Sequence, residues 1–169
     1  PSVESNSDTD STIRGTIIHR VLELMDNNTK QEIETQILEE FADNISKSII
    51  FESIEEAKSV FNHGEFSQFF NPQFYFQAFN EMPVLLNISG KMKPGIIDRI
   101  VVNEKEVVIL DYKSHSDAKV EDLSVIAAEY QQQMSFYGRV AEKLWPGKRI
   151  RLIILFTHYL ESIEITHNV

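Results

Sequence analysis

The spacing of apolar residues divides the chain into a helical first part and a second part dominated by strands. We expect residues 1–12, rich in Ser, Asp, Asn and Thr, to be frayed or disordered. A helix is predicted over about 13–26, because one face carries the apolar residues Ile17, Val21, Leu24 and Met25. Two further helices are predicted over about 30–46 and 53–62, because each begins with capping-box spacing. These capping boxes pair Thr29 with Glu32 and Ser53 with Glu56.

From about residue 74, β-branched and aromatic residues predict strands. They cover about 74–88, 95–102, 107–113, 149–157 and 161–165, with an interruption of the first at Glu81-Met82-Pro83. A long helix is predicted over about 122–144 and ends at Trp145-Pro146-Gly147. The pattern predicts an α/β (α+β) fold. We expect a single domain over 13–169, with a helical part at about 13–70 and a part made of the sheet and a helix at about 74–169.

The second and third predicted strands are joined by a short polar stretch and predict a β-hairpin. Pairing Val102 with Val107 across the turn places Asp98 directly opposite Asp111. Because side chains alternate along a strand, Lys113 shares the face of Asp111. Opposed carboxylates, with Cβ atoms roughly 4.5–5.5 Å apart, repel each other. A divalent cation such as Mg²⁺ between them is the simplest explanation, since hard cations take carboxylate oxygens.

The alternative is that Asp98 and Asp111 are surface residues on an exposed hairpin. Their neighbours on the same face are apolar, so we expect the carboxylates to point toward the core; these neighbours are Ile96, Ile100, Val102, Val107 and Ile109. Partly buried carboxylates need a partner, which favours the metal site. Lys113 is compatible with a salt bridge to either aspartate and with a cation that acts on a metal-bound water or a phosphate.

Charge and composition narrow the classes of function. The chain has 169 residues and a net charge of −10; residues 1–80 hold 14 acids and 5 Lys/Arg, and residues 81–169 hold 12 and 11. The acidic excess therefore lies in the first part, and we expect weak unaided affinity for DNA. The absence of cysteine excludes disulfides, zinc–cysteine sites and iron–sulfur clusters, and fits a cytoplasmic location. No apolar run reaches the roughly 20 residues of a membrane span.

Two other features of the sequence bear on its function. The chain begins with Pro1 rather than Met, so we expect a processed chain or a piece of a longer protein. It contains no Gly-x-x-x-x-Gly-Lys-Ser/Thr loop, so we do not expect it to be an ATPase itself.

Three groups of residues allow both a structural and a functional interpretation. Tyr130, Gln133 and Tyr137 share one helix face, either as core residues with solvated hydroxyls or as a polar strip that lines a cleft. His19 lies on the polar face of the first helix, as a solvent-exposed histidine or as a neutral metal ligand. The aromatic run at 69–79 favours a core segment, with a base-stacking platform as the alternative.

Five short motifs, in this order, resemble the PD-(D/E)xK nuclease superfamily, specifically the C-terminal nuclease domain of RecB/AddA-type helicase–nucleases (exonuclease V beta subunit). The match spans residues 15–137 and depends on the combination, because each motif alone is common. The motifs are Gly15-Thr16-Ile17-Ile18-His19-Arg20-Val21-Leu22-Glu23, Glu81-Met82-Pro83, Gly95-Ile96-Ile97-Asp98-Arg99-Ile100, Leu110-Asp111-Tyr112-Lys113-Ser114 and Tyr130-Gln131-Gln132-Gln133-Met134-Ser135-Phe136-Tyr137.

The resemblance implies a restriction-endonuclease-like core, in which helices flank a mixed sheet of about four to five strands, with an N-terminal helical segment. It also implies a role for each matching residue. The metal ligands would be His19, Asp98, Asp111 and the carbonyl of Tyr112, the catalytic lysine would be Lys113, and the remaining site residues would be Gln133, Tyr137 and Glu81. The chain departs from those relatives that carry a four-cysteine iron–sulfur staple, because it has no cysteine.

The activity implied is a Mg²⁺-dependent deoxyribonuclease, with Mn²⁺ as a substitute, acting as the exonuclease module of a helicase–nuclease in double-strand break repair and recombination. The implied partners are DNA and a helicase domain or subunit. One alternative is a catalytically inactive nuclease-like module that binds DNA or partner subunits. A second is a metal-free carboxylate-pair hydrolase acting on sugars, to which the adjacent lysine is poorly suited.

Overall fold

The chain divides after Phe66 into two compact units. The computed structural model describes residues 4–43, 45–88 and 90–167. Within those three ranges, no helix combines the length and the apolar character that crossing a membrane requires.

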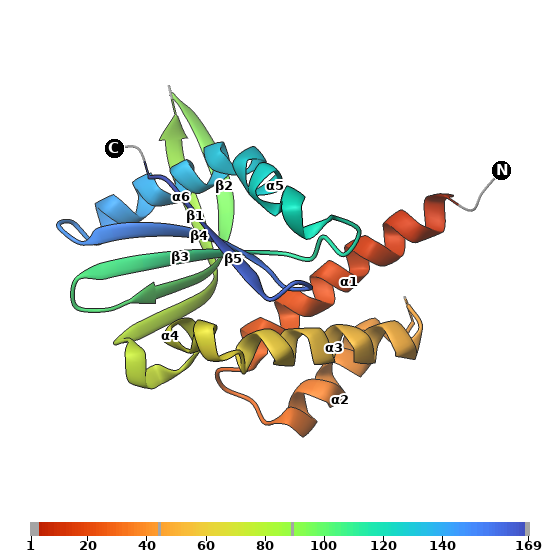
Figure 1. Cartoon of the computed structure of the whole chain (residues 1–169). Coiled ribbons are helices and arrows are strands. Elements are labelled where there is room, and N and C mark those ends of the chain that lie inside the picture. Colours follow the sequence, from red (N-terminus) through yellow and green to blue (C-terminus); the bar gives the residue numbers. More distant parts are fainter. Residues whose placement is uncertain (1–3, 44, 89, 168–169) are drawn as a thin grey trace. The chain divides into compact units, whose positions relative to one another are not determined.

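The first unit is helical, as predicted (Figure 1). Its helices are α1 (Glu4–Leu24), α2 (Lys30–Phe41) and α3 (Lys47–Phe61), followed by a short 3-10 helix at Gly64–Phe66. The first helix begins at Glu4 rather than near Ile13, so much of the segment expected to be frayed is helical; residues 1–3 lie outside the described ranges. Buried apolar residues of the three helices form the core, among them Ile17, Ile18, Val21, Ile37, Ile54 and Ala57.

Local capping explains where the second and third helices begin. Thr29 caps α2, and its capping box with Glu32 is confirmed. The predicted cap of the third helix is wrong, because Ser46 occupies that position and its side chain accepts from the Ile49 N–H. Ser53 instead lies buried inside α3 and donates its hydroxyl to the carbonyl of Ile49. A serine can satisfy its hydroxyl this way within a helix, so capping-box spacing alone did not locate the terminus.

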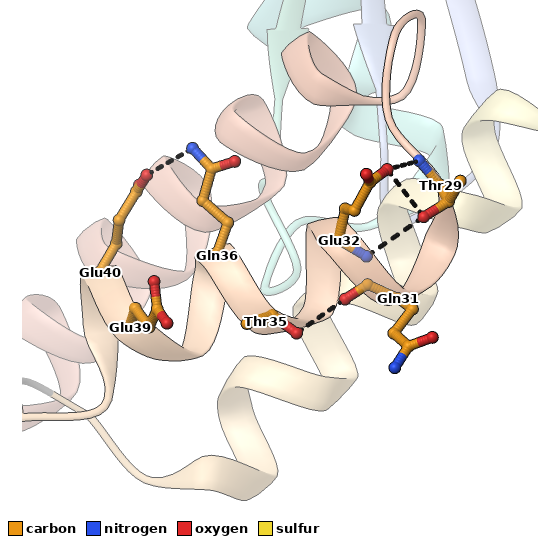
Figure 2. A pocket seen from close by; sticks show the side chains of 7 residues that line it. All are labelled: Thr29, Gln31, Glu32, Thr35, Gln36, Glu39 and Glu40. Atoms are coloured by element: carbon orange, nitrogen blue, oxygen red, sulfur yellow. Dashed lines mark hydrogen bonds between the residues drawn. The ribbon is translucent and has the colours of Figure 1, made fainter.

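A shallow hollow on α2 is lined by polar and acidic side chains between Thr29 and Glu40 (Figure 2). Its groups are engaged in the structure of the helix. Glu32 accepts from the N–H and hydroxyl of Thr29, and Glu40 accepts from Gln36 and forms an ion pair with Arg20. These contacts lower the pKa of both carboxyls, chiefly through the hydrogen bonds to Thr29 and to Arg20 respectively. The hollow therefore owes its charge to helix capping and surface pairing.

The second unit is built on a mixed five-stranded sheet in the order β1-β2-β3-β4-β5. β3 and β4 are parallel and the other neighbours are antiparallel. This architecture confirms the predicted fold class. The strands are β1 (Gln77–Ile88), β2 (Lys91–Val102), β3 (Glu106–Lys113), β4 (Arg149–Phe156) and β5 (Glu161–Ile165). The helices are α4 (Ser67–Phe70), α5 (Leu123–Glu129) and α6 (Gln131–Leu144), with 3-10 turns at Pro72–Phe74 and Val120–Asp122.

The parallel pair explains the position of the long helical segment. A parallel connection needs a crossover, which α5 and α6 supply between β3 and β4. The predicted helix over 122–144 is broken at Tyr130, so it forms two helices. Figure 1 shows α6 lying against the sheet. The core between them includes Ile100, Ile109, Met134, Phe136 and Leu152.

The other face of the sheet carries Val101, Val108, Leu110, Tyr112 and Ile153, all buried. The ring of Phe70 from α4 stacks on Tyr112, with centroids 6.4 Å apart. The aromatic run at 69–79 was predicted to be core, and this is only partly right. Phe69 and Phe70 are buried, but Phe74, Phe76 and Phe79 are exposed. The residue type does not distinguish the buried phenylalanines from the exposed ones, because burial here depends on which residues α4 turns toward the sheet.

Candidate metal centre

Asp98 and Asp111 are buried acidic residues on neighbouring strands. Asp98 in β2 is 9% exposed and Asp111 in β3 is 2% exposed. The predicted hairpin register is confirmed from Val102↔Val107 to Arg99↔Leu110, where the pairing ends one step before the two aspartates. At that point the Asp98 carboxylate continues the contact, because its Oδ2 accepts from the Tyr112 N–H at 2.6 Å. The Asp98 side chain on β2 therefore binds the backbone of β3 at the residue next to Asp111.

Glu81 lies beside Asp98 on the other neighbouring strand. The pairs Asn80↔Arg99 and Met82↔Ile97 flank it, so the register places Glu81 opposite Asp98. A carboxylate oxygen of Glu81 lies within 4.8 Å of one of Asp98. Its backbone φ of 48° is uncommon for a residue with a Cβ, and such conformations concentrate at functional sites. Three strands therefore bring acidic side chains toward one part of the sheet.

The alternation of side chains shifts at this point in β2. Ile97 and Ile100 belong to the same core cluster, although strict alternation would place them on opposite faces. Ile96, predicted to share the inward face of Asp98, is instead 53% exposed. That prediction was wrong because the unusual backbone at Glu81 turns the paired strands without inserting a residue. The buried state of Asp98 thus depends on a local twist.

Lys113 is held as a cation next to Asp111. Its Nζ lies 2.7 Å from Asp111 Oδ2 and 4.3 Å from the centroid of the Tyr130 ring. Burial lowers the pKa of Lys113, but the charge and hydrogen bond of Asp111, with smaller contributions from Tyr130 and Asp98, outweigh it. The net effect is a pKa above the ordinary lysine value. The side chain therefore supplies a positive charge and does not act as a base near neutral pH.

Tyr137 and Gln133 connect α6 to the strand that carries Asp98. Gln133 Nε2 donates to Tyr137 Oη at 2.9 Å, and Tyr137 Oη donates to the carbonyl of Ile96 at 2.7 Å. Burial raises the pKa of Tyr137; the hydrogen bond from Gln133 opposes this, and the nearby charges of Asp111 and Asp98 add to it. The hydroxyl therefore stays protonated and fixes β2 two residues before Asp98.

Gly95 permits this close packing. A Cβ at Gly95 would lie 3.0 Å from Tyr137 Cε1 and 3.1 Å from Phe136 Cε1. These distances are shorter than ordinary carbon contacts. The glycine that opens the motif of Asp98 is thus required by the approach of two rings from α6.

Arg99 and His115 are residues of this unit for which sequence reasoning proposed no role in the site. Arg99 is fully buried on the strand that carries Asp98. Its guanidinium donates to the Phe69 carbonyl at 2.9 Å, Asn80 Oδ1 at 2.7 Å and Tyr75 Oη at 3.1 Å. His115 Nε2 lies 2.9 Å from Tyr130 Oη, beside the ring that contacts Lys113. In the sequence, the only indication of a role for Arg99 is its position directly after Asp98.

The predicted site residues fall into two groups. Glu81, Asp98, Asp111 and Lys113 lie on adjacent strands of the second unit, with Tyr137 and Gln133 against β2. His19 lies on α1, in the first unit, so its part in the site stays a prediction. The three carboxylates are hard oxygen donors of the kind that Mg²⁺ and Mn²⁺ prefer. The burial of Asp98 and Asp111 and the proximity of Glu81 to Asp98 favour a cation beside them.

Comparison with known proteins identifies the group to which this arrangement belongs. Residues 2–165 match the model of the PD-(D/E)XK nuclease superfamily. The chain belongs to this superfamily. The match confirms the resemblance to the superfamily that was drawn from the five motifs.

Individual relatives agree with this membership. An ATP-dependent helicase/nuclease protein, found in two strains of Clostridium kluyveri, is 28% identical over 165 residues, covering 85% of this chain and 13% of the relative. The chain therefore spans a small part of these curated relatives. A crystal structure from Eubacterium rectale, of a protein assigned as an exonuclease, has 15% identity and a TM-score of 0.59. It covers 93% of this chain and 59% of the other, and supports the fold.

Proposed function

We propose that this chain is the metal-dependent deoxyribonuclease module of a helicase–nuclease, acting as an exonuclease on DNA. The observation that carries the proposal is the position of Asp98, which has an oxygen within 4.8 Å of one of Glu81 on β1 and accepts from the Tyr112 N–H on β3. Asp111 precedes Tyr112, and its carboxylate lies 2.7 Å from the ammonium group of Lys113. Membership of the PD-(D/E)XK superfamily supports the nuclease chemistry.

The residues that would hold the metal are Asp98, Asp111 and the backbone carbonyl of Tyr112, with His19 as the proposed nitrogen ligand. Glu81 would bind the same ion or a water on it. A bound Mg²⁺ or Mn²⁺ would polarise the phosphate and lower the pKa of a bound water. The chemistry of the donors fits such an ion, because the three side chains present carboxylate oxygens.

The remaining residues act through charge and position. Lys113 stabilises the negative charge that develops on the phosphate oxygens when water attacks phosphorus and the 3′-oxygen leaves. Its raised pKa keeps the ammonium group charged at neutral pH. Tyr137 and Gln133 hold β2 so that Asp98 keeps its orientation, and Arg99 anchors the same strand from its other side.

A helicase partner would account for the acidity of the chain. With a net charge of −10, the chain is expected to bind DNA weakly by itself, since phosphate neutralisation supplies most non-specific affinity. A helicase that delivers a strand would remove the need for a strongly basic surface. The Clostridium relative is a helicase/nuclease protein far longer than this chain, which supports that arrangement. We infer a role in double-strand break repair and recombination, in the cytoplasm.

The test is a cleavage assay with Asp111→Ala. The wild-type chain is expected to degrade linear DNA with Mg²⁺ or Mn²⁺ and to stop when EDTA is added. The variant should lose at least about a hundredfold in rate, the scale of removing one electrostatic group from an active site. Asp117→Ala, which removes an exposed acid of the same unit, is the matched control and should keep its activity. Full activity of Asp111→Ala would refute the assignment.

A further inference from the structure

The Lys113 ammonium group has two neighbours of different kinds. Its Nζ lies 2.7 Å from Asp111 Oδ2 and 4.3 Å from the centroid of the Tyr130 ring. A cation within about 6 Å of an aromatic centroid is attracted by the negative face of the ring. The lysine side chain is 19% exposed, so water competes little with either contact. Asp111 and Tyr130 therefore hold the ammonium group together.

The contact with Asp111 alone would not fix Lys113 for catalysis. Asp111 is a proposed metal ligand, so its oxygens would be shared with the ion, and the ammonium group would be repelled by the charge of that ion. Lysine has a flexible four-carbon stem, and its head would then be free to move among several positions. The Tyr130 ring is uncharged and is not a ligand that hard cations prefer. Its hold on the ammonium group therefore does not depend on the state of Asp111.

The break between α5 and α6 places Tyr130 at this position. Tyr130 follows the last residue of α5 and precedes the first residue of α6, with φ −89° and ψ 3°. Its N–H donates to the Ala127 carbonyl at 3.1 Å, and its carbonyl accepts from the Met134 N–H at 2.9 Å. The backbone of Tyr130 is thus held by both helices, so its Cβ points in a fixed direction.

His115 holds the outer end of the same ring. Its Nε2 lies 2.9 Å from Tyr130 Oη, and its ring packs on Phe156 of β4, with centroids 6.2 Å apart. The loop that carries His115 is braced by Tyr159, whose hydroxyl donates to the Ser116 carbonyl at 3.1 Å. A ring that is fixed both at its backbone and at its hydroxyl keeps one face toward the ammonium group.

We propose that Tyr130 is a positioning residue, whose ring holds the Lys113 ammonium group beside Asp111, and that His115 holds the ring. An ammonium group has three N–H donors. One meets Asp111 and one faces the ring, so the third is left for a phosphate oxygen of the substrate. This inference rests on the proposed nuclease function and adds Tyr130 and His115 to it. They act on the rate of cleavage through Lys113 and bind neither the metal nor the DNA.

The test uses variants of the full chain that remove the ring or its hydrogen bond. Tyr130→Leu removes the ring, while Tyr130→Phe and His115→Phe keep an aromatic ring and break the same bond from its two ends. Trp145→Leu is the matched control, because Trp145 is also a partly buried aromatic residue packed against the core cluster. His115 is exposed, so its variant is expected to fold and keeps the test valid if Tyr130→Leu unfolds.

The first measurement needs neither metal nor DNA. Lysines are reductively methylated with ¹³C-formaldehyde, which keeps their charge, and the NMR resonance of Lys113 is identified by its loss from Lys113→Arg. A methyl group over the face of a ring is shielded, so in the wild type and in Trp145→Leu this resonance should lie upfield of that of an exposed lysine. In Tyr130→Leu it should move to the position of an exposed lysine, and Tyr130→Phe and His115→Phe should give intermediate positions.

The second measurement separates kcat from KM in DNA cleavage with Mn²⁺. Tyr130→Leu should lose about tenfold in kcat, within the range of a partly desolvated cation–π contact. Its KM for DNA and its Mn²⁺ affinity should equal those of the wild type. Tyr130→Phe and His115→Phe should show smaller, equal losses, and the double variant should lose no more than either, because both substitutions remove the same bond. Trp145→Leu should keep the wild-type kcat.

An unchanged Lys113 resonance or an unchanged kcat in Tyr130→Leu would overturn the proposal. Losses in Trp145→Leu equal to those in Tyr130→Leu would also overturn it, because Tyr130 would then be a core residue only. If Tyr130→Leu unfolds, an unchanged kcat in His115→Phe has the same force. If the Lys113 resonance responds to Tyr130→Leu while the wild type cuts no DNA, the positioning of Lys113 by Tyr130 stands and the proposed nuclease function fails.

Discussion

At the scale of single residues, the backbone of Glu81 decides the geometry of the centre. Its φ of 48° costs a residue with a Cβ roughly 1–2 kcal/mol. The strands keep one register on both sides of Glu81. The unusual backbone therefore changes the direction of the strands and not their pairing, and Glu81 lies close to Asp98. Sequence order alone suggested Glu81 as a site residue. Its proximity to Asp98 could not be predicted, because a positive φ at a non-glycine residue has no signal in one sequence.

The aspartates and the lysine, in contrast, were predictable from local rules. A polar turn fixes the hairpin register, and the register brings Asp98 to the motif that carries Asp111 and Lys113. Arg99 was not assigned a role, because its partners Phe69, Tyr75 and Asn80 come from parts of the chain whose placement depends on tertiary packing.

The charge of Lys113 gives a prediction about pH. Because its pKa is raised above the unfolded value near 10.5, the ammonium group stabilises the fold below that pH, and the contribution is lost as pH rises through the folded-state pKa. The difference in free energy of unfolding between wild type and Lys113→Met should therefore be largest near neutral pH and shrink at strongly alkaline pH. Urea titrations across the range measure it.

Variants of Lys113 also test whether its positive charge contributes to DNA cleavage. Lys113→Arg keeps a positive group and should retain more DNA cleavage than Lys113→Met at neutral pH. A cleavage rate that rises with pH as the Lys113 ammonium group loses its proton would contradict its role as a cation.

At the scale of elements, existence and order were predictable while boundaries and breaks were not. All five strands were located by their β-branched and aromatic residues. The split of the predicted helix at Tyr130 was missed, although this break places the Tyr130 ring against Lys113. Helical periodicity continues across such a break, so apolar spacing does not reveal it.

Packing of α6 against β2 gives a second prediction. Tyr137→Phe removes the partly buried hydrogen bond to the Ile96 carbonyl, at a cost of about 1 kcal/mol in free energy of unfolding. The variant should also bind Mn²⁺ more weakly, because β2 carries Asp98. Tyr159→Phe, which removes hydroxyl contacts to the Ser116 and Ala118 carbonyls, is the matched control. An equal loss of Mn²⁺ affinity in both variants would count against a positioning role for Tyr137.

The anchoring of β2 by Arg99 gives a third prediction. Arg99→Met should destabilise the fold by about 1–3 kcal/mol for each acceptor that loses its donor, because it removes the guanidinium contacts of the Phe69 carbonyl and Asn80. Arg99→Lys should recover little, since one ammonium group cannot reproduce the three-way contact. Thermal unfolding of both variants measures this. Stability of Arg99→Met equal to wild type would show that the network is dispensable.

At the scale of the whole molecule, the chain contains a helical unit and a unit built on a five-stranded sheet, and it corresponds to 13% of its Clostridium relatives. The fold class could be predicted, because alternating strands and a crossover helix allow few topologies. The contribution of His19 to the centre could not be derived from the second unit alone. It follows from the resemblance and stays a prediction to be tested with the metal.

The central claim is that acidic side chains from adjacent strands hold one divalent ion beside Lys113. Calorimetric titration with Mn²⁺ tests it most directly, on wild type, Asp98→Asn and the control Asp117→Asn. Wild type and the control should bind with equal affinity. Asp98→Asn should bind at least about tenfold more weakly, which is the smallest loss expected even for an outer partner of a metal ligand. Equal Mn²⁺ affinity of Asp98→Asn and wild type would contradict the claim.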